Sequence, residues 1–106
     1  MAYIYQVSFN IQPDQMNELQ IGASLERVLG YLRTLLPSQA GFIEARVLYS
    51  VDQPEQTHVV CISEWEHWED LKRHCASALS EEKVLAEFAP HITKDDLVIR
   101  TYDEVA

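Results

Sequence analysis

The stretch from Thr57 to Cys75, THVVCISEWEHWEDLKRHC, constrains the fold more than any other part of this chain. The residues up to Trp65 form an apolar run typical of a strand, and the residues that follow have a helical pattern. The hydrophobic period therefore changes from 2 to about 3.6 at this point. This change predicts a strand that runs directly into a helix, with a tryptophan at the junction. Such a junction either caps the end of a sheet or lines a small pocket.

The rest of the chain predicts three more strands and one more helical region. The expected strands are residues 3–11, 42–50, 57–65 and 97–102, and the expected helical regions are 13–36 and 66–89, the second broken near 77–80. Pro13 with Asp14 is expected to open the first helix, because proline suits a first turn and an acidic residue suits the helix dipole. The order β-α-β-β-α-β predicts one domain, residues 1–106, of the α+β ferredoxin-like class. Its four-stranded antiparallel sheet carries both helices on one face.

The alternation of side chains along the strands indicates which face of the sheet the helices cover. One face of each strand is mainly apolar and should pack under the helices: Tyr3, Tyr5, Val7, Phe9 and Ile11; Ile43, Ala45, Val47 and Tyr49; Thr57, Val59, Cys61, Ser63 and Trp65. The opposite face mixes polar groups with Ile4, Phe42, Leu48, Val60 and Ile62. So much open apolar surface favours a partner, and an identical chain is the simplest one. We expect a homodimer.

Composition argues against several other classes of partner. The 106 residues include 17 acidic and 8 basic side chains, a net charge of −9 that repels nucleic acid and an anionic membrane. No apolar run approaches the roughly 18–20 residues of a membrane span, and the N-terminus MAYIYQVSF lacks the pattern of a signal peptide. Cys61 and Cys75 lie in different expected elements without CxxC spacing. We therefore expect buried thiols in a cytoplasmic protein.

Several segments resemble the dimeric α/β-barrel proteins of the antibiotic-biosynthesis monooxygenase type. They are the string Gly41 to Leu48, the strand ending in Ser63-Glu64-Trp65, the helix from Glu69 to Ser77, and Val84 to Pro90. The resemblance implies a monooxygenase that oxidises a small aromatic or quinol-like molecule between sheet and helices. In such an oxidation the substrate is deprotonated and its carbanion reacts with O₂, without a metal or a flavin. The alternative is a non-catalytic dimeric module that binds a small molecule or a partner.

The resemblance, together with strand parity, indicates which residues would form the site. Trp65 and His74 are the candidate catalytic residues, Trp65 as a wall and N–H donor and His74 as the proton carrier. Phe9, Tyr49, Cys61 and His91 are the candidate substrate-binding residues. Each has a structural alternative: a core tryptophan, a buried histidine bonded to a backbone carbonyl, core packing, or, for His91, a cation at a helix end. A cavity of a few hundred Å³ beside Trp65 and His74 would favour the enzyme.

Motifs for other chemistries are absent from the sequence. None of the four histidines has a partner at the i,i+4 spacing of a helical metal pair, so no metal site is expected. GxSxG, P-loop and GxGxxG strings do not occur, and hydrolase, NTPase and dinucleotide functions receive no support. The acids Glu64, Glu66, Glu69 and Asp70 are explained by the dipole of the helix that they precede or begin.

Overall fold

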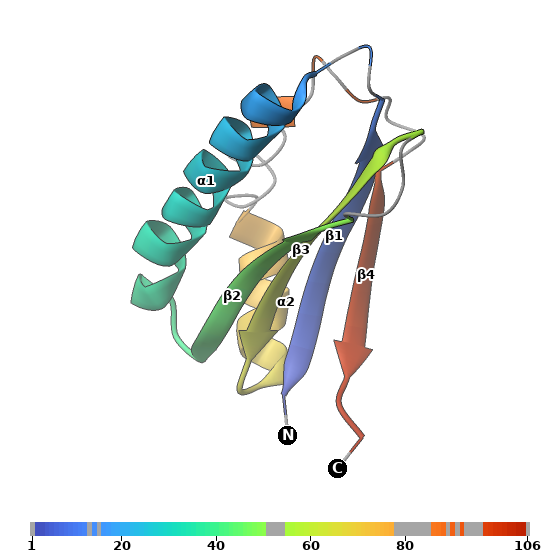
Figure 1. Ribbon diagram of the computed structural model, residues 1–106. Coiled ribbons are helices and arrows are strands. Elements are labelled where there is room, and N and C mark those ends of the chain that lie inside the picture. The colour runs from blue at the N-terminus through green and yellow to red at the C-terminus, as the bar shows by residue number, and fades with distance from the viewer. Residues whose placement is uncertain are drawn as a thin grey trace.

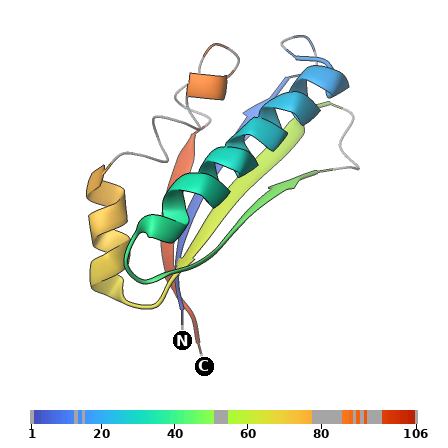
Figure 2. The same ribbon diagram turned by 90° about the vertical axis from the view of Figure 1, so that its left-hand side faces the viewer.

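The computed structural model describes residues 2–12, 14, 16–50, 55–77, 86–88, 90, 92 and 97–105. Its elements are β1 (Tyr3–Ile11), α1 (Glu18–Leu35), the 3₁₀ turn η1 (Leu36–Ser38), β2 (Phe42–Tyr49), β3 (Thr57–Trp65), α2 (Trp68–Ser77) and β4 (Val98–Asp103). The strands form one antiparallel sheet in the order β2-β3-β1-β4. Both helices lie on the same face of this sheet (Figure 1, Figure 2). The ferredoxin-like α+β prediction is confirmed.

Helix α1 begins later than the sequence pattern predicted. Asp14 lies in a turn, and the helix starts at Glu18. The start is set by a capping box: Asn17 Oδ1 accepts from the backbone N–H of Gln20 at 2.8 Å, and Gln20 Oε1 accepts from the backbone N–H of Asn17 at 2.9 Å. These two bonds satisfy donors that a helix end leaves open. The prediction of a start at Pro13 and Asp14 was therefore wrong, because this reciprocal cap decides the boundary.

The core lies between the sheet and the helices, on the face that strand parity predicted. Alternate residues of β1 and β3 are buried beneath α1, whose own buried side chains repeat at helical spacing. The buried strand residues are Tyr5, Val7, Phe9, Ile11, Val59, Cys61, Ser63 and Trp65, and those of α1 are Ile21, Ser24, Leu25, Val28 and Leu32. Helix α2 adds Leu71 and His74 at its own helical spacing. Trp65 therefore points inward, as predicted.

Two contacts attach residues 86–88 to this core. Phe88 is buried, and its ring centroid lies 4.9 Å from that of Phe9. Glu87 pairs with Arg27 of α1 at 2.9 Å, and this carboxylate raises the pKa of the Arg27 guanidinium by hydrogen bonding and charge. The expected break in the second helical region, near 77–80, lies for the most part outside the described residues.

A β-bulge at the start of β2 changes the parity of that strand. Phe42 is the partner of Trp65 across the β2–β3 pair and Glu44 is the partner of Glu64, so Ile43 is the extra residue. An extra residue sends the side chains before it to the other face. Phe42 accordingly packs against the core, with its ring centroid 5.6 Å from that of Trp65. The prediction that Phe42 lies on the open face was wrong for this reason.

The junction between β3 and α2 rests against Gly41. The backbone N–H of Glu66 donates to the carbonyl oxygen of Gly41 at 2.8 Å. Gly41 has φ +78°, a left-handed conformation that favours glycine, and a Cβ there would overlap the carboxylate of Asp70. Glu69 and Asp70 occupy the first turn of α2, where their charges suit the helix dipole as predicted.

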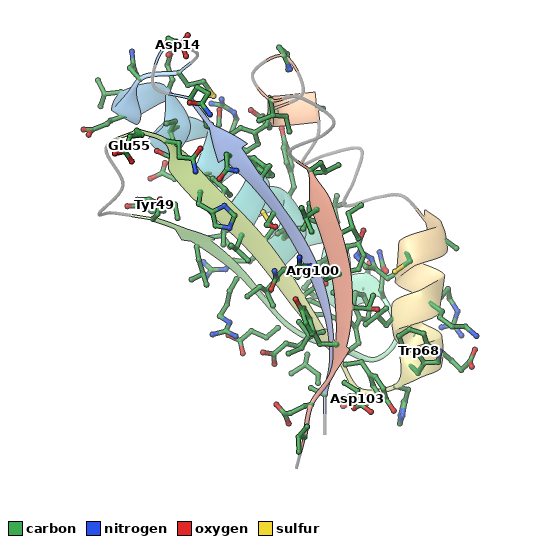
Figure 3. All side chains as sticks on the ribbon, turned by 90° about the vertical axis from the view of Figure 1, so that its right-hand side faces the viewer. Asp14, Tyr49, Glu55, Trp68, Arg100 and Asp103 are labelled. Atoms are coloured by element: carbon green, nitrogen blue, oxygen red, sulfur yellow. The ribbon has the colours of Figure 1, made fainter. Side chains whose placement is uncertain are left out.

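The face of the sheet opposite the helices is open (Figure 3). Leu48 is 48% exposed there, and Val60 and Ile62 are half-buried beside it. Arg46 pairs with Glu64 at 3.2 Å across β2 and β3, and Nδ1 of His58 lies 2.8 Å from Oδ1 of Asn10 across β3 and β1. At the edge strand β4 every residue is exposed. Within the described residues, no helix is long and apolar enough to cross a membrane.

Candidate functional site

Trp65 and His74, the two candidate catalytic residues, are in direct contact. Their rings stack with centroids 4.6 Å apart and planes inclined by 26°. Trp65 ends β3 and His74 lies in α2, and both side chains are buried. The ring of Tyr5 meets that of His74 edge-on at 5.2 Å, and Phe42 meets Trp65 edge-on on another side. We call Tyr5, Phe42, Trp65 and His74 the aromatic cluster; it joins three strands to α2.

The indole N–H of Trp65 has a partner inside the same strand. Nε1 donates to Oγ of Ser63 at 2.9 Å, in a buried hydrogen bond. Residues two apart in a strand share one face, so this contact follows from the spacing Ser63-Glu64-Trp65. An indole has one donor. The expected role of Trp65 as a direct donor to a substrate therefore does not fit this structure, because that donor is already engaged by Ser63.

A hollow adjoins the aromatic cluster between the sheet and the end of α1. It is lined by Tyr5, Val7, Leu32, Leu36, Cys61, Ile62 and Ser63. Its enclosed room is about 10 Å³, and the space reaches about 250 Å³ only when the open solvent at its mouth is included. The enclosed part therefore holds about one water molecule. Tyr5 and Ser63 separate the hollow from His74 and Trp65, which are not among its lining residues.

Cys61 is the candidate substrate-binding residue that the structure places in this hollow. Burial raises the pKa of its thiol to about 12, because the apolar surroundings disfavour the thiolate. At neutral pH Cys61 is therefore an uncharged wall of the hollow and not a base or nucleophile. Within the aromatic cluster, His74 contributes an imidazole, a ring that can accept and donate a proton.

The other candidate residues lie elsewhere. Phe9 is buried against Phe88 and does not line the hollow. Tyr49 lies at the opposite end of β2 from Phe42 and is 58% exposed, far from the labelled Trp68 in Figure 3. His91 lies outside the described residues. The structure thus brings together three of the six candidates, Trp65, His74 and Cys61. Sequence reasoning missed Ser63, although its place two residues before Trp65 was a readable signal.

In the described part of the chain, no three His, Cys, Asp or Glu side chains come close enough to hold a metal ion. The four acids near the β3–α2 junction are accounted for by other contacts. Asp70 pairs with Arg73 at 3.3 Å, Glu69 with Lys72 at 3.5 Å, and Glu64 with Arg46. Glu66 is exposed beside His67.

Solved structures share this fold over nearly the whole chain. A protein from Bacillus cereus assigned to the antibiotic biosynthesis monooxygenases has a TM-score of 0.66 at 22% identity, over 100% of this chain and 97% of its own. SnoaB, a cofactor-independent oxygenase from Streptomyces nogalater, has a TM-score of 0.64 at 14% identity, over 97% and 92%. A dimeric protein of unknown function with a ferredoxin-like fold from Bacteroides fragilis has 0.68 at 10%, over 96% of each chain. No protein-family model and no curated protein sequence matches this chain.

Proposed function

We propose that this chain, which has the ferredoxin-like fold of the antibiotic-biosynthesis monooxygenase-type proteins, is a monooxygenase that acts on a small aromatic or quinol-like molecule without a metal or a flavin. The observation that carries the proposal is the buried stack of Trp65 and His74, which adjoins the hollow through Tyr5 and Ser63. A flat apolar wall next to a titratable imidazole is what deprotonation of an aromatic substrate requires. The shared fold with SnoaB, a cofactor-independent oxygenase, supports it.

In the proposed reaction, the side chains of the site move one proton and exclude water. His74 does not line the hollow, so this step requires Tyr5 and Ser63 to move and let the substrate reach the imidazole. His74 then accepts a proton from the substrate, whose carbanion bonds to one oxygen atom of O₂. Where the reacting carbon is a CH₂ group, the O–O bond then breaks. One oxygen stays as the carbonyl, and the other leaves as water with the two hydrogens of that carbon. The carbon is oxidised and O₂ is reduced. Val7, Leu32 and Leu36 line an apolar space that suits the ring.

A second candidate function is a non-catalytic dimeric module that binds a small molecule in the same hollow. The stacking of Trp65 and His74 on each other, which fills the space beside Trp65, favours it. Because the enclosed room is only about 10 Å³, such a ligand would lie in the open mouth of the hollow. A module of this kind would keep the aromatic cluster as core packing. In that case His74 would stabilise the fold and transfer no proton.

We further propose that the protein is a homodimer through the open face of the sheet. Leu48, Val60 and Ile62 form an apolar strip there, and Arg46 with Glu64 gives it a charged border. A self-complementary strip of this kind suits two-fold symmetry. The dimeric protein from Bacteroides fragilis, which shares the fold, supports the proposal. We expect the protein in the cytoplasm, a reducing compartment that suits the buried thiol of Cys61.

Oxygen uptake with a panel of hydroquinones and anthrone-like compounds tests the leading proposal. The wild type is compared with His74→Ala and, as a matched control, with His67→Ala, whose side chain is 74% exposed. Loss of a general base lowers a rate by about 10²–10⁴-fold, so we expect such a loss for His74→Ala and none for His67→Ala. Equal rates in the wild type and His74→Ala would remove His74 from the mechanism. A wild type that oxidises none of the compounds would leave only the binding module.

A further inference from the structure

Ser63 occupies the middle of the site. Ser63 lies on β3 between Tyr5 of β1 and Ala45 of β2. It is only 4% exposed and lines the hollow. It shares a strand face with Cys61 on one side and Trp65 on the other. The hydroxyl is thus a polar group in a largely apolar wall. Such a group requires hydrogen-bond partners, because a buried polar group without them is costly.

The hydrogen bonds of the Ser63 hydroxyl can be counted. A serine hydroxyl has one donor and two acceptor lone pairs. Trp65 Nε1 donates to Oγ, which uses one lone pair. Among the described residues, the hydrogen bond from Trp65 is the one that the Ser63 hydroxyl makes, so its own hydrogen is not donated to a described residue. The donor of Ser63 is therefore available to an occupant of the hollow.

The contact with Trp65 makes this donor stronger and better directed. A hydroxyl that accepts a hydrogen bond is polarised and becomes a better donor. The indole is held in turn by its stack on His74 and its edge contact with Phe42. Because this packing fixes the direction of the indole N–H, it also fixes which lone pair of Ser63 Oγ accepts the hydrogen bond. Since Ser63 lines the hollow, the hydrogen of its hydroxyl can turn toward a ligand there.

The walls of the hollow indicate the chemistry of its ligand. Val7, Leu32 and Leu36 are apolar, and Cys61 stays an uncharged thiol. Among the described residues that line the hollow there is no Lys or Arg, so a bound oxygen anion would depend on hydrogen bonding to them. One strong donor in an apolar wall suits a ring that carries a single hydroxyl or oxyanion. The donor would stabilise the oxyanion more than the neutral hydroxyl.

We infer that Trp65 and Ser63 form a hydrogen-bond relay that holds the ring oxygen of a phenolic or quinol-type ligand in the hollow. The inference deepens the proposed function, on which its aromatic ligand rests, and makes Ser63 a specificity-determining residue. Deprotonation of the ring hydroxyl by any base would then be favoured at this position. The ligand class follows as well: aromatic molecules without a ring oxygen gain nothing from the relay.

Binding of 4-nitrophenol tests the relay without turnover, since the visible absorbance of the probe reports its ionisation. We expect the wild type to bind the phenolate about 10–100-fold more tightly than Ser63→Ala, the usual worth of a hydrogen bond to a charged group. The pKa of the bound phenol should be lower in the wild type than in Ser63→Ala. Ser63→Thr, which keeps the hydroxyl, should restore both values.

Three controls separate the relay from a structural role of Ser63. The probe 4-nitrotoluene has the same shape without the hydroxyl and should bind equally to the wild type and to Ser63→Ala. Ser8→Ala removes an equally buried serine from the other face of β1 and should leave phenolate binding unchanged. Trp65→Phe keeps an aromatic ring and removes the N–H, so it should weaken phenolate binding and spare 4-nitrotoluene.

The failure of the relay and the failure of the proposed oxidation are distinguishable. A wild type that prefers 4-nitrophenolate in this way but consumes no O₂ with the quinol panel would refute the oxygenase and support the relay. A wild type that does not bind 4-nitrophenol, or binds it as Ser63→Ala does, overturns the relay even if turnover is found. Equal weakening of both probes in Ser63→Ala also overturns it, because that result indicates lost packing.

Discussion

Substitution of Gly41 by alanine should destabilise the fold through the β3–α2 junction. The residue has φ +78°, where a side chain is strained. The added Cβ would also lie 2.8 Å from Cβ of Asp70 and closer still to its carboxylate. Asp70 is in the first turn of α2 and its side chain is only 12% exposed, so it has little room to move. Two separate penalties therefore meet at one position.

The size of the effect follows from these two terms. A left-handed conformation costs a residue with a Cβ about 1–2 kcal/mol, and crowding in a packed site adds about 1–3 kcal/mol. We expect a loss of about 2–5 kcal/mol in the free energy of unfolding. For a chain of this length, each kcal/mol shifts the melting temperature by about 4–5 °C. The melting temperature of Gly41→Ala should therefore fall by about 8–25 °C.

Thermal unfolding followed by circular dichroism measures this shift. Gly30→Ala is the matched control, since Gly30 lies in α1 with no atom within 4 Å of an added Cβ. It should stabilise the protein by about 0.5–1 kcal/mol, because alanine is the better helix former. In an Asp70→Ala background the overlap with the carboxylate is removed, whereas the contact of 2.8 Å with Cβ of residue 70 stays. Gly41→Ala should therefore cost less there than in the wild type, but more than the left-handed backbone alone, which costs about 1–2 kcal/mol. A melting temperature of Gly41→Ala close to that of the wild type would refute the reasoning.

Two further predictions concern burial and assembly. Burial raises the pKa of the Cys61 thiol from 9.0 in the unfolded chain to about 12 in the folded protein. The free energy of unfolding of the wild type, relative to that of Cys61→Ala, should therefore fall as pH rises from 9.0 to about 12, by up to about 1.4 kcal/mol per pH unit. Urea unfolding at several pH values measures this difference in stability, and a difference that does not change with pH would contradict the effect of burial. Leu48→Glu should dissociate the proposed homodimer in analytical ultracentrifugation, because it places a carboxylate in the interface. The control Leu19→Glu changes an 86% exposed position of α1 and should leave the dimer intact. If Leu48→Glu still sediments as a dimer, the open face is not the interface.

Regular alternation made most of the fold predictable. Val59, Cys61 and Trp65 are buried where a period of 2 places them, and the helical spacing of Leu71 and His74 puts both side chains in the core. These patterns repeat over many residues, so they identify a strand or a helix even where one residue departs from them. The ferredoxin-like order of elements then follows from the sequence of strands and helices.

Contacts that depend on one residue were not predictable in the same way. The bulge at Ile43 moves Phe42 to the core, yet nothing in the composition of β2 indicates an extra residue. The predicted start of α1 was wrong because Pro13 and Asp14 are typical of a helix start, whereas the Asn17–Gln20 capping box sets the boundary.

Half of the candidate site residues, Trp65, His74 and Cys61, lie together in the structure, but the hydrogen bonds around them were not predictable. Trp65 and His74 were expected in one site, and the structure stacks them directly. The engagement of the indole N–H by Ser63 depends on side-chain rotamers, which a sequence pattern does not contain. That bond, more than the identity of the residues, decides which group is left to contact a ligand.

The bulge at Ile43 also has a consequence for comparing sequences. Residues before it and after it are out of phase, so a relative with a regular strand would align one position off on one side of Ile43. In such an alignment Phe42, which packs on Trp65, would be matched to a residue of the relative that faces outward. The residue of the relative that is truly equivalent to Phe42 would then be paired with a different residue of this chain. A gap of one residue placed at Ile43 restores the match. A one-residue insertion or deletion at Ile43 therefore corresponds to the presence or absence of the bulge, and the mismatches next to it arise from the shifted register of the strand.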